Sequence, residues 1–98
     1  MTTIPQIIDY SLAKKAIETW GAAAQIDMCI EECAELIDAL CKYKRGRCSD
    51  DHVAEEIVDV TIMVTQMAAL FDTAAQCKWF DIKVQRITNK LNTSTNAS

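Results

Sequence analysis

The sequence predicts an all-α protein, and composition and apolar spacing both support that class. Half of the 98 residues are hydrophobic, whereas only two are glycine and one is proline, so few turns interrupt the chain. Apolar residues recur at the spacings of three and four that are typical of amphipathic helices. We therefore expect one small four-helix bundle-type domain over residues 1–92 and a flexible, polar C-terminal tail over residues 93–98.

The first two predicted helices are separated by a glycine. The first helix covers residues 4–20, and Gly21 is well placed to cap its C-terminus or to turn the chain. The second runs from about Ala23 to Tyr43. Residues 42–47 (Lys-Tyr-Lys-Arg-Gly-Arg) then form a basic turn.

The third predicted helix runs from about Asp50 to Phe71. Ser49 provides an N-cap signal, and acidic residues follow in the first turn, where the helix dipole favours them. From Val58 onward the helix is apolar on nearly all sides, which a small chain covers poorly. We therefore expect a homo-oligomer that buries part of it.

The last predicted helix runs from about Thr73 to Leu91. Its apolar residues define an inner face that consists of Phe80, Val84, Ile87 and Leu91. Another face carries a cationic stripe at spacings of three and four, formed by Lys83, Arg86 and Lys90.

Charge and composition exclude several functions. The net charge of −4 argues against a general nucleic-acid binder, and no apolar run approaches the roughly 20 residues of a membrane span. The N-terminus lacks signal-peptide features, and the five cysteines are odd in number with no CxxC spacing, which favours buried thiols in a reducing cytoplasm. Trp20 and Trp79 are interpreted as packing anchors, and His52 as an exposed, non-catalytic residue.

Two pairs of carboxylates stand out. Glu32 and Glu35 share one face of the second helix, and Glu56 and Asp59 share one face of the third. Each pair has the same offset from an apolar stripe, so packing the stripes together is expected to bring all four acids to one edge of the seam. The two stripes are Ile26, Ile30, Cys33, Ile37 and Leu40, and Val53, Ile57, Val60, Val64 and Ala68.

Four acids at one edge repel one another unless a multivalent cation lies between them. Oxygen ligands without matching His or Cys suit Mg²⁺ or Mn²⁺, and such a centre fits hydrolysis of a phosphate ester. Basic side chains are available to neutralise a polyphosphate: Lys42, Lys44, Arg45, Arg47, Lys83, Arg86 and Lys90.

These residues carry a resemblance to a known family. Glu31-Glu32-x-x-Glu35 followed by Glu56-x-x-Asp59 resembles the EExxE…ExxD signature of the MazG-type, all-α nucleoside triphosphate pyrophosphohydrolases. The flanks are also similar to short phage and bacterial members: Trp20-Gly21, Gln25, residues 39–45 and Lys83-x-x-Arg86. The resemblance covers roughly residues 18–91.

The resemblance implies Mg²⁺-dependent cleavage of the α–β phosphate bond of an NTP or dNTP, which gives the monophosphate and pyrophosphate. It implies that the metal ligands are Glu32, Glu35, Glu56 and Asp59. Glu31 would orient or deprotonate the attacking water. The residues that it places on the phosphates are Lys83 and Arg86, and it also implies homodimers or homotetramers.

Three alternatives remain open from the sequence. A phosphoribosyl-ATP pyrophosphohydrolase is a neighbour within the same enzyme class. A carboxylate-bridged di-iron bundle normally needs two Glu-x-x-His pairs, whereas this chain has one histidine. The third alternative is a non-catalytic helical interaction or regulatory module, in which the acids hold a structural ion.

Overall fold

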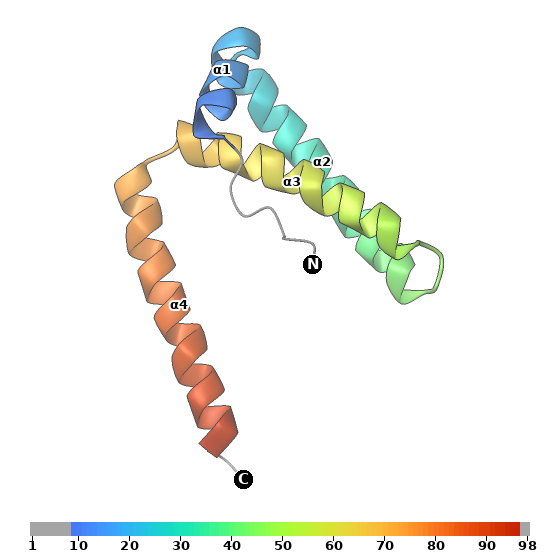
Figure 1. The fold of residues 1–98 in the computed structure, drawn as a ribbon, viewed down its shortest axis with the longest axis vertical. Coiled ribbons are helices and arrows are strands. Elements are labelled where there is room, and N and C mark those ends of the chain that lie inside the picture. Colours follow the sequence, from blue (N-terminus) through green and yellow to red (C-terminus); the bar gives the residue numbers. More distant parts are fainter. Residues whose placement is uncertain (1–8, 97–98) are drawn as a thin grey trace.

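Four α-helices make up the chain in a computed structural model that describes residues 9–96 (Figure 1). They are α1 (Tyr10–Trp20), α2 (Ala22–Lys44), α3 (Asp50–Leu70) and α4 (Thr73–Asn96). The all-α class is therefore confirmed, and no strand occurs within residues 9–96. The part of the first predicted helix over residues 4–8 lies outside the described residues.

The helix ends follow the local signals in the sequence. Asp9 caps α1 by accepting a hydrogen bond from the Ser11 backbone N–H at 2.9 Å. Ser49 caps α3 in the same way, because its hydroxyl accepts from the His52 N–H at 3.1 Å. Gly21 separates α1 from α2 with a φ of 91°, a conformation that glycine adopts at little cost.

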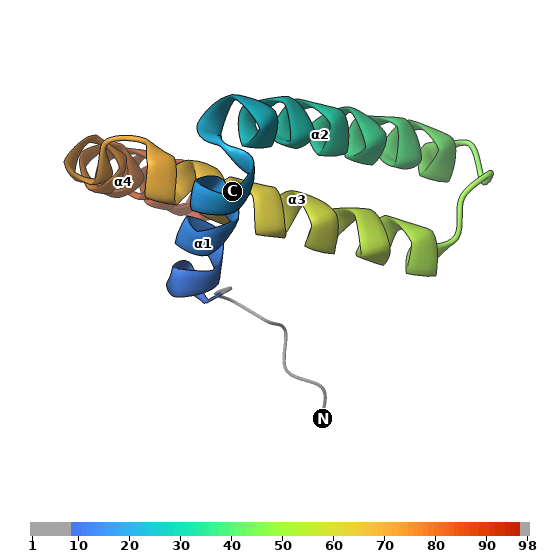
Figure 2. The same ribbon diagram turned by 90° about the horizontal axis from the view of Figure 1, so that it is seen from above.

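Helices α2 and α3 form an antiparallel hairpin that holds most of the interior. They pack along each other and are joined by residues 45–49, while α1 crosses them at the opposite end (Figure 2). The turn between them includes Gly46, which has a φ of 71°. This antiparallel packing places the turn of α2 that carries Glu32 and Glu35 beside the turn of α3 that carries Glu56 and Asp59.

The α2–α3 seam contains more polar groups than the apolar pattern indicates. Ala39 and Met63 are buried there, but so are Gln25, Glu56 and Gln66. Five members of the two expected stripes remain 44% to 64% exposed: Ile30, Ile37, Leu40, Ile57 and Val64. The others are half-buried, namely Ile26, Cys33, Val53, Val60 and Ala68.

The expected stripe pairing is therefore only half right. The buried positions Gln25 and Ala39 are separated from Glu32 by seven residues, or about two turns, so all three lie on one face of α2. The seam thus passes through the carboxylates instead of beside them. The apolar pattern alone predicted the wrong position for the seam, because such a pattern assigns every apolar face to the interior of the same chain.

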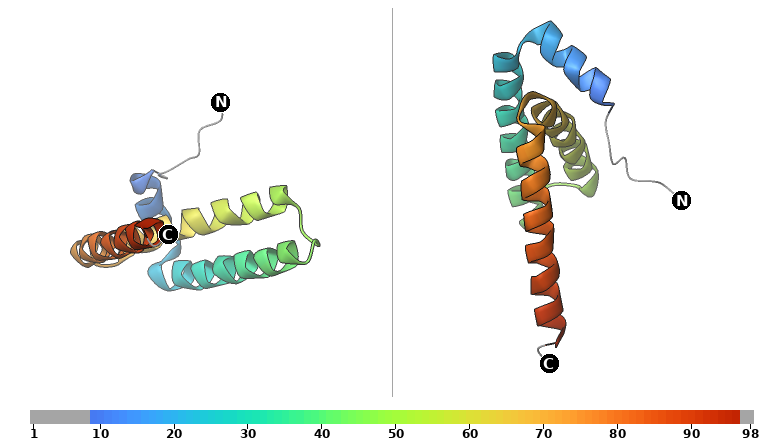
Figure 3. Two further views of the ribbon diagram at one scale, coloured as in Figure 1. Left: turned by 90° about the horizontal axis from the view of Figure 1, so that it is seen from below. Right: turned by 90° about the vertical axis from the view of Figure 1, so that its left-hand side faces the viewer.

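Helix α4 leads away from the other three helices (Figures 1 and 3). It packs against α3 near their joint, where the Gln76 side-chain amide donates to the carbonyls of Ala68 at 3.1 Å and Phe71 at 3.2 Å. Its expected inner face is exposed, with Phe80 at 68% and Ile87 at 58%. A four-helix bundle is therefore not completed within one chain.

The C-terminal boundary also differs from the expected one. Helix α4 continues beyond Leu91 and ends at Asn96, so residues 93–96 are helical in the structure. Residues 97–98 lie outside the described part of the chain. None of the described helices combines the length and apolar character needed to cross a membrane. The five cysteines are free thiols, but the expectation that they are buried is wrong. Cys29, Cys33 and Cys48 are half-buried, and Cys41 and Cys77 are exposed.

Candidate metal centre and adjoining pocket

Three predicted ligands converge between α2 and α3. One carboxylate oxygen from each of Glu32, Glu35 and Glu56 lies within 4.8 Å of the other two. Oxygen ligands bind Mg²⁺ at about 2.0–2.1 Å and Ca²⁺ at about 2.3–2.6 Å, so ligands on opposite sides of one ion are separated by roughly this distance. The expected convergence of acids from both helices is therefore found for these three residues, and the cluster can hold a metal ion.

Asp59 and Glu31 lie near the cluster without belonging to the closest group. Asp59 is half-buried on α3, and its charge acts on both Glu32 and Glu56. It also lines the same pocket as Glu32. Glu31 is exposed on α2 and exerts a smaller effect on Glu32.

Two carboxylate oxygens of the cluster are buried and lack a partner. Glu56 is only 6% exposed, and its Oε2 atom has no hydrogen-bond donor within reach. Oε2 of Glu32 is buried and unpaired as well. Because buried polar atoms in proteins are nearly always paired, these two oxygens are suited to bind a cation or to accept a hydrogen bond in the seam.

The electrostatics of the cluster point the same way. Burial raises the pKa of Glu32 above its ordinary value, and the neighbouring charges of Glu35, Asp59 and Glu56 raise it further. Burial also raises the pKa of Glu56, with Glu35 and Asp59 adding to the effect. Both carboxyl groups are therefore harder to ionise than isolated ones, and a bound cation would favour their charged forms.

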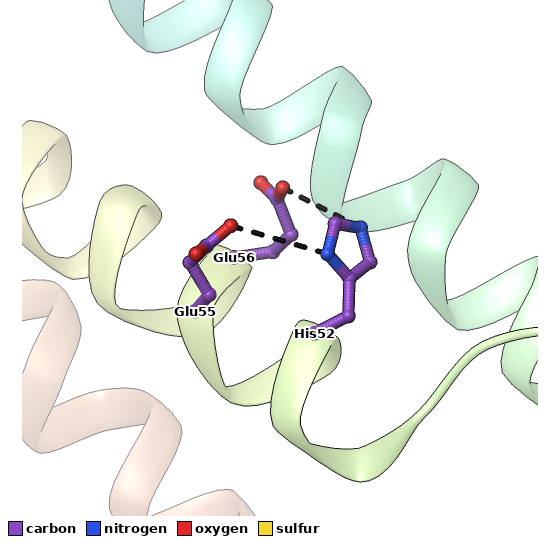
Figure 4. Close-up of side chains that lie close together, drawn as sticks. All are labelled: His52, Glu55 and Glu56. Carbon is purple, nitrogen blue, oxygen red and sulfur yellow. Dashed lines mark ion pairs between the residues drawn. The ribbon is translucent and has the colours of Figure 1, made fainter.

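His52 adds a nitrogen to this region (Figure 4). Its Nε2 atom lies 3.7 Å from Oε1 of Glu56, and its Nδ1 atom lies 3.9 Å from Oε1 of Glu55. When protonated, His52 lowers the pKa of Glu56 against the stronger opposing effects. These three residues form a second group of potential ligands, which shares Glu56 with the first. His52 is exposed, as expected, but it is not remote from the acids.

The predicted phosphate-binding residues are not gathered at the cluster within one chain. Lys42, on the last turns of α2, forms an ion pair with Asp38 at 2.9 Å, and Arg45 follows the end of that helix. The cationic stripe of Lys83, Arg86 and Lys90 is exposed on α4, which leads away from α2 (Figure 1).

A pocket of about 610 Å³ opens beside the carboxylates. Glu32 and Asp59 line it, together with Trp20, Ala24, Gln25, Met28, Ile62, Met63 and Gln66. Trp20 is 64% exposed and Trp79 is 46% exposed, so the interpretation of both as packing anchors is wrong within one chain.

Gln66 was not recognised from the sequence, and Gln25 was noted only as a flanking residue. The signal that identifies both is their spacing from the acids. Gln25 lies seven residues before Glu32 and Gln66 lies seven after Asp59, which puts each amide on the same helix face as an acid.

Comparison with known proteins finds no matching family model, no matching curated protein and no matching solved structure. The chemistry of the site rests on its own geometry. Carboxylates from two helices offer hard oxygen ligands, which suit Mg²⁺, Mn²⁺ or Ca²⁺. The neighbouring pocket, mostly apolar with a few polar groups, is typical of small-molecule sites.

Proposed function

We propose that this protein is a Mg²⁺-dependent nucleoside triphosphate pyrophosphohydrolase, which cleaves the α–β phosphate bond to give a monophosphate and pyrophosphate. The observation that carries the proposal is the group formed by Glu32, Glu35 and Glu56, in which two buried oxygens lack a partner. The resemblance of the EExxE…ExxD pattern to the MazG-type enzymes supports the choice of reaction.

Each acid has a role in this proposal. Glu32, Glu35 and Glu56 hold the ion, with Mn²⁺ as an alternative to Mg²⁺, and Asp59 completes the ligand set from the pocket side. When bound, the metal polarises the phosphoryl oxygens and lowers the pKa of a bound water. Glu31 is exposed next to Glu32, where it can orient the attacking water or accept its proton.

Phosphate contacts from the cations of α4 require a second copy of the chain. Lys83, Arg86 and Lys90 lie on α4, away from the carboxylates of their own chain. The same helix exposes large apolar side chains, including Phe80 and Ile87, which a second copy would cover. We propose a homodimer or homotetramer in which α4 of one chain brings its cations to the carboxylates of another. Lys42 and Arg45 remain candidates at the turn of the hairpin.

The decisive experiment measures pyrophosphate release from a panel of NTPs and dNTPs with Mg²⁺ and with EDTA. We expect Glu35→Gln and Asp59→Asn each to lower kcat/KM by more than about 100-fold, because even an outer partner of a metal ligand typically contributes 10- to 100-fold. Asp27→Asn is the matched control, since Asp27 is an exposed acid on α2 that lines neither the cluster nor the pocket. Circular dichroism checks that every variant remains folded.

The same experiment separates the enzyme from a regulatory module. A module with a structural ion would be stabilised by Mg²⁺ yet would release no pyrophosphate from any nucleotide. Unchanged activity in both the Glu35 and Asp59 variants would instead refute the assignment of the site.

A further inference from the structure

Two buried amides lie in the pocket beside the carboxylates. Gln25 precedes Glu32 by two helical turns on α2, and Gln66 follows Asp59 by two turns on α3, which is about 10 Å along each helix. Because the two helices are antiparallel, both amides are displaced toward the same end of the hairpin, where α1 crosses. The pocket therefore has an acidic end and an amide end.

Gln66 has an unmet need for a hydrogen-bond donor. The residue is only 5% exposed, and its Oε1 atom is buried without a partner. The lining around it is largely apolar, with Met28, Ile62 and Met63 in the same pocket. An unpaired buried carbonyl oxygen is costly, so a ligand that brings an N–H group would gain more at this position than at an exposed amide.

The shape and chemistry of the pocket restrict that ligand. Trp20 borders it with a largely exposed indole, which offers a flat apolar surface for stacking. The two-turn separation from the acids is comparable to the span of a nucleoside from its 5′ oxygen to the far edge of its base. A planar group with an N–H edge at one end and phosphates at the other matches both ends of the pocket.

We propose that Gln66, assisted by Gln25, recognises the nucleobase and determines which nucleotides this protein accepts. The Gln66 carbonyl accepts from an amino or ring N–H group of the base, and the amide N–H groups donate to an adjacent base acceptor. A polyphosphate without a base leaves Gln66 unpaired and is bound weakly. This inference rests on the proposed function and identifies the substrate group that the same site selects.

Binding can be measured separately from hydrolysis by the fluorescence of Trp20. In a Trp79→Phe background, Trp20 is the only tryptophan. The probes are non-hydrolysable α,β-imido nucleotides with adenine, guanine, cytosine and uracil, and tripolyphosphate, each with Mg²⁺. We expect Kd to differ by at least about tenfold between bases and tripolyphosphate to bind most weakly. Gln66→Met should raise the Kd of the nucleotide that binds most tightly by at least about tenfold. Gln85→Met, an exposed change on α4 outside the pocket, should leave the affinities unchanged.

Two further readouts guard against a merely structural role for Gln66. Gln66→Met should not lower the Tm of the ligand-free protein, because it removes an unpaired buried acceptor and keeps the volume. Gln25→Met provides a second variant and should reduce the same discrimination between bases. Equal affinity for all bases and tripolyphosphate, or unchanged discrimination in both variants, would overturn the proposal, as would a large loss of Tm in Gln66→Met.

The outcome is distinguishable from failure of the proposed function. Base-dependent binding without pyrophosphate release would leave the recognition by Gln66 standing and refute the hydrolase. Pyrophosphate release at equal efficiency from nucleotides with every base would refute base recognition by Gln66 and leave the hydrolase standing.

Discussion

Carboxylate oxygens of Glu32 and Glu56 lie within 4.8 Å of each other across the α2–α3 seam, and the Oε2 atom of each side chain is buried without a hydrogen-bond partner. Helices α2 and α3 therefore pack together at a place where two carboxylates, when ionised, repel each other. The stability of the hairpin is therefore expected to depend on what lies between the two acids.

Mg²⁺ should raise the Tm of the wild-type protein relative to EDTA. An ion that binds only the folded state at 100 times its Kd stabilises that state by about 2.7 kcal/mol. The increase should be much smaller in Glu32→Gln, because one ligand is lost, and unchanged in the exposed control Asp27→Asn. Thermal melts followed by circular dichroism provide the measurement. An equal increase in all three proteins would show that the ion binds elsewhere.

The contribution of Glu56 to the stability of the metal-free protein should decrease as the pH rises above about 4.5, the ordinary pKa of a glutamate. Burial and neighbouring acids raise the pKa of Glu56 in the folded state, so the folded protein binds this proton more tightly than the unfolded chain. The resulting stabilisation is complete below the unfolded pKa and is lost as the pH rises through the folded pKa. The Glu56→Gln variant has no ionisable group at this position, so it cannot lose this stabilisation as the pH rises.

Melts in EDTA across this pH range should therefore show the Tm of Glu56→Gln rising relative to that of the wild type. At pH 7, saturating Mg²⁺ should lower the Tm of Glu56→Gln relative to that of the wild type, since only the wild type retains the complete set of ligands. A constant difference in EDTA at all pH values would contradict the electrostatic account.

Replacing the α4 apolar residue Ile87 with Glu should reduce the size of the particle in solution. Ile87 is 58% exposed in the single chain, so the change costs little there but places a charge in any apolar contact between copies. Light scattering coupled to size exclusion gives the mass. Gln85→Glu adds a similar charge elsewhere on the helix as a control. A wild-type mass equal to that of one chain would rule out the second copy on which the proposed phosphate contacts of α4 depend.

Ser49→Ala should lower stability by about 1 kcal/mol, the usual contribution of a serine N-cap. The Ser49 hydroxyl accepts from the His52 N–H at 3.1 Å, which fixes the first turn of α3 close to Glu56. Denaturant melts measure the difference, and Ser49→Thr, which keeps the hydroxyl, should recover most of it. A loss in both variants would indicate a role other than capping.

Local signals predicted the helices well. Ser49 marks the start of α3 and Gly21 the end of α1 because capping depends on residues within a few positions of each other. Helical spacing also placed Glu32 and Glu35 on one face of α2, because it fixes which side chains of a helix share a face. Capping and helical spacing need no knowledge of distant parts of the chain, whereas the convergence with Glu56 depends on how α3 packs against α2.

The arrangement of the helices was harder to predict for a physical reason. An apolar face looks the same in sequence whether it packs within one chain or remains exposed in it, so Ile37 and Ile87 were assigned to the interior although both are exposed. The opposite error hid Gln66, because hydrophobicity assigns a glutamine to the surface although this one is buried. Only its spacing of seven residues from Asp59 indicates that it shares a helix face with an acid, and its burial depends on the packing of α2 against α3.

The glycine between α1 and α2 has a consequence for the shape of the pocket. Gly21 has a φ of 91° and open space around its α-carbon, so its backbone torsion, and not crowding, resists substitution. That torsion sets the angle at which α1 leaves the hairpin, and with it the position of Trp20 along the rim of the pocket. A residue at position 21 that prefers a negative φ would therefore shift Trp20 at the rim of the pocket and leave the α2–α3 seam, with its three carboxylates, in place.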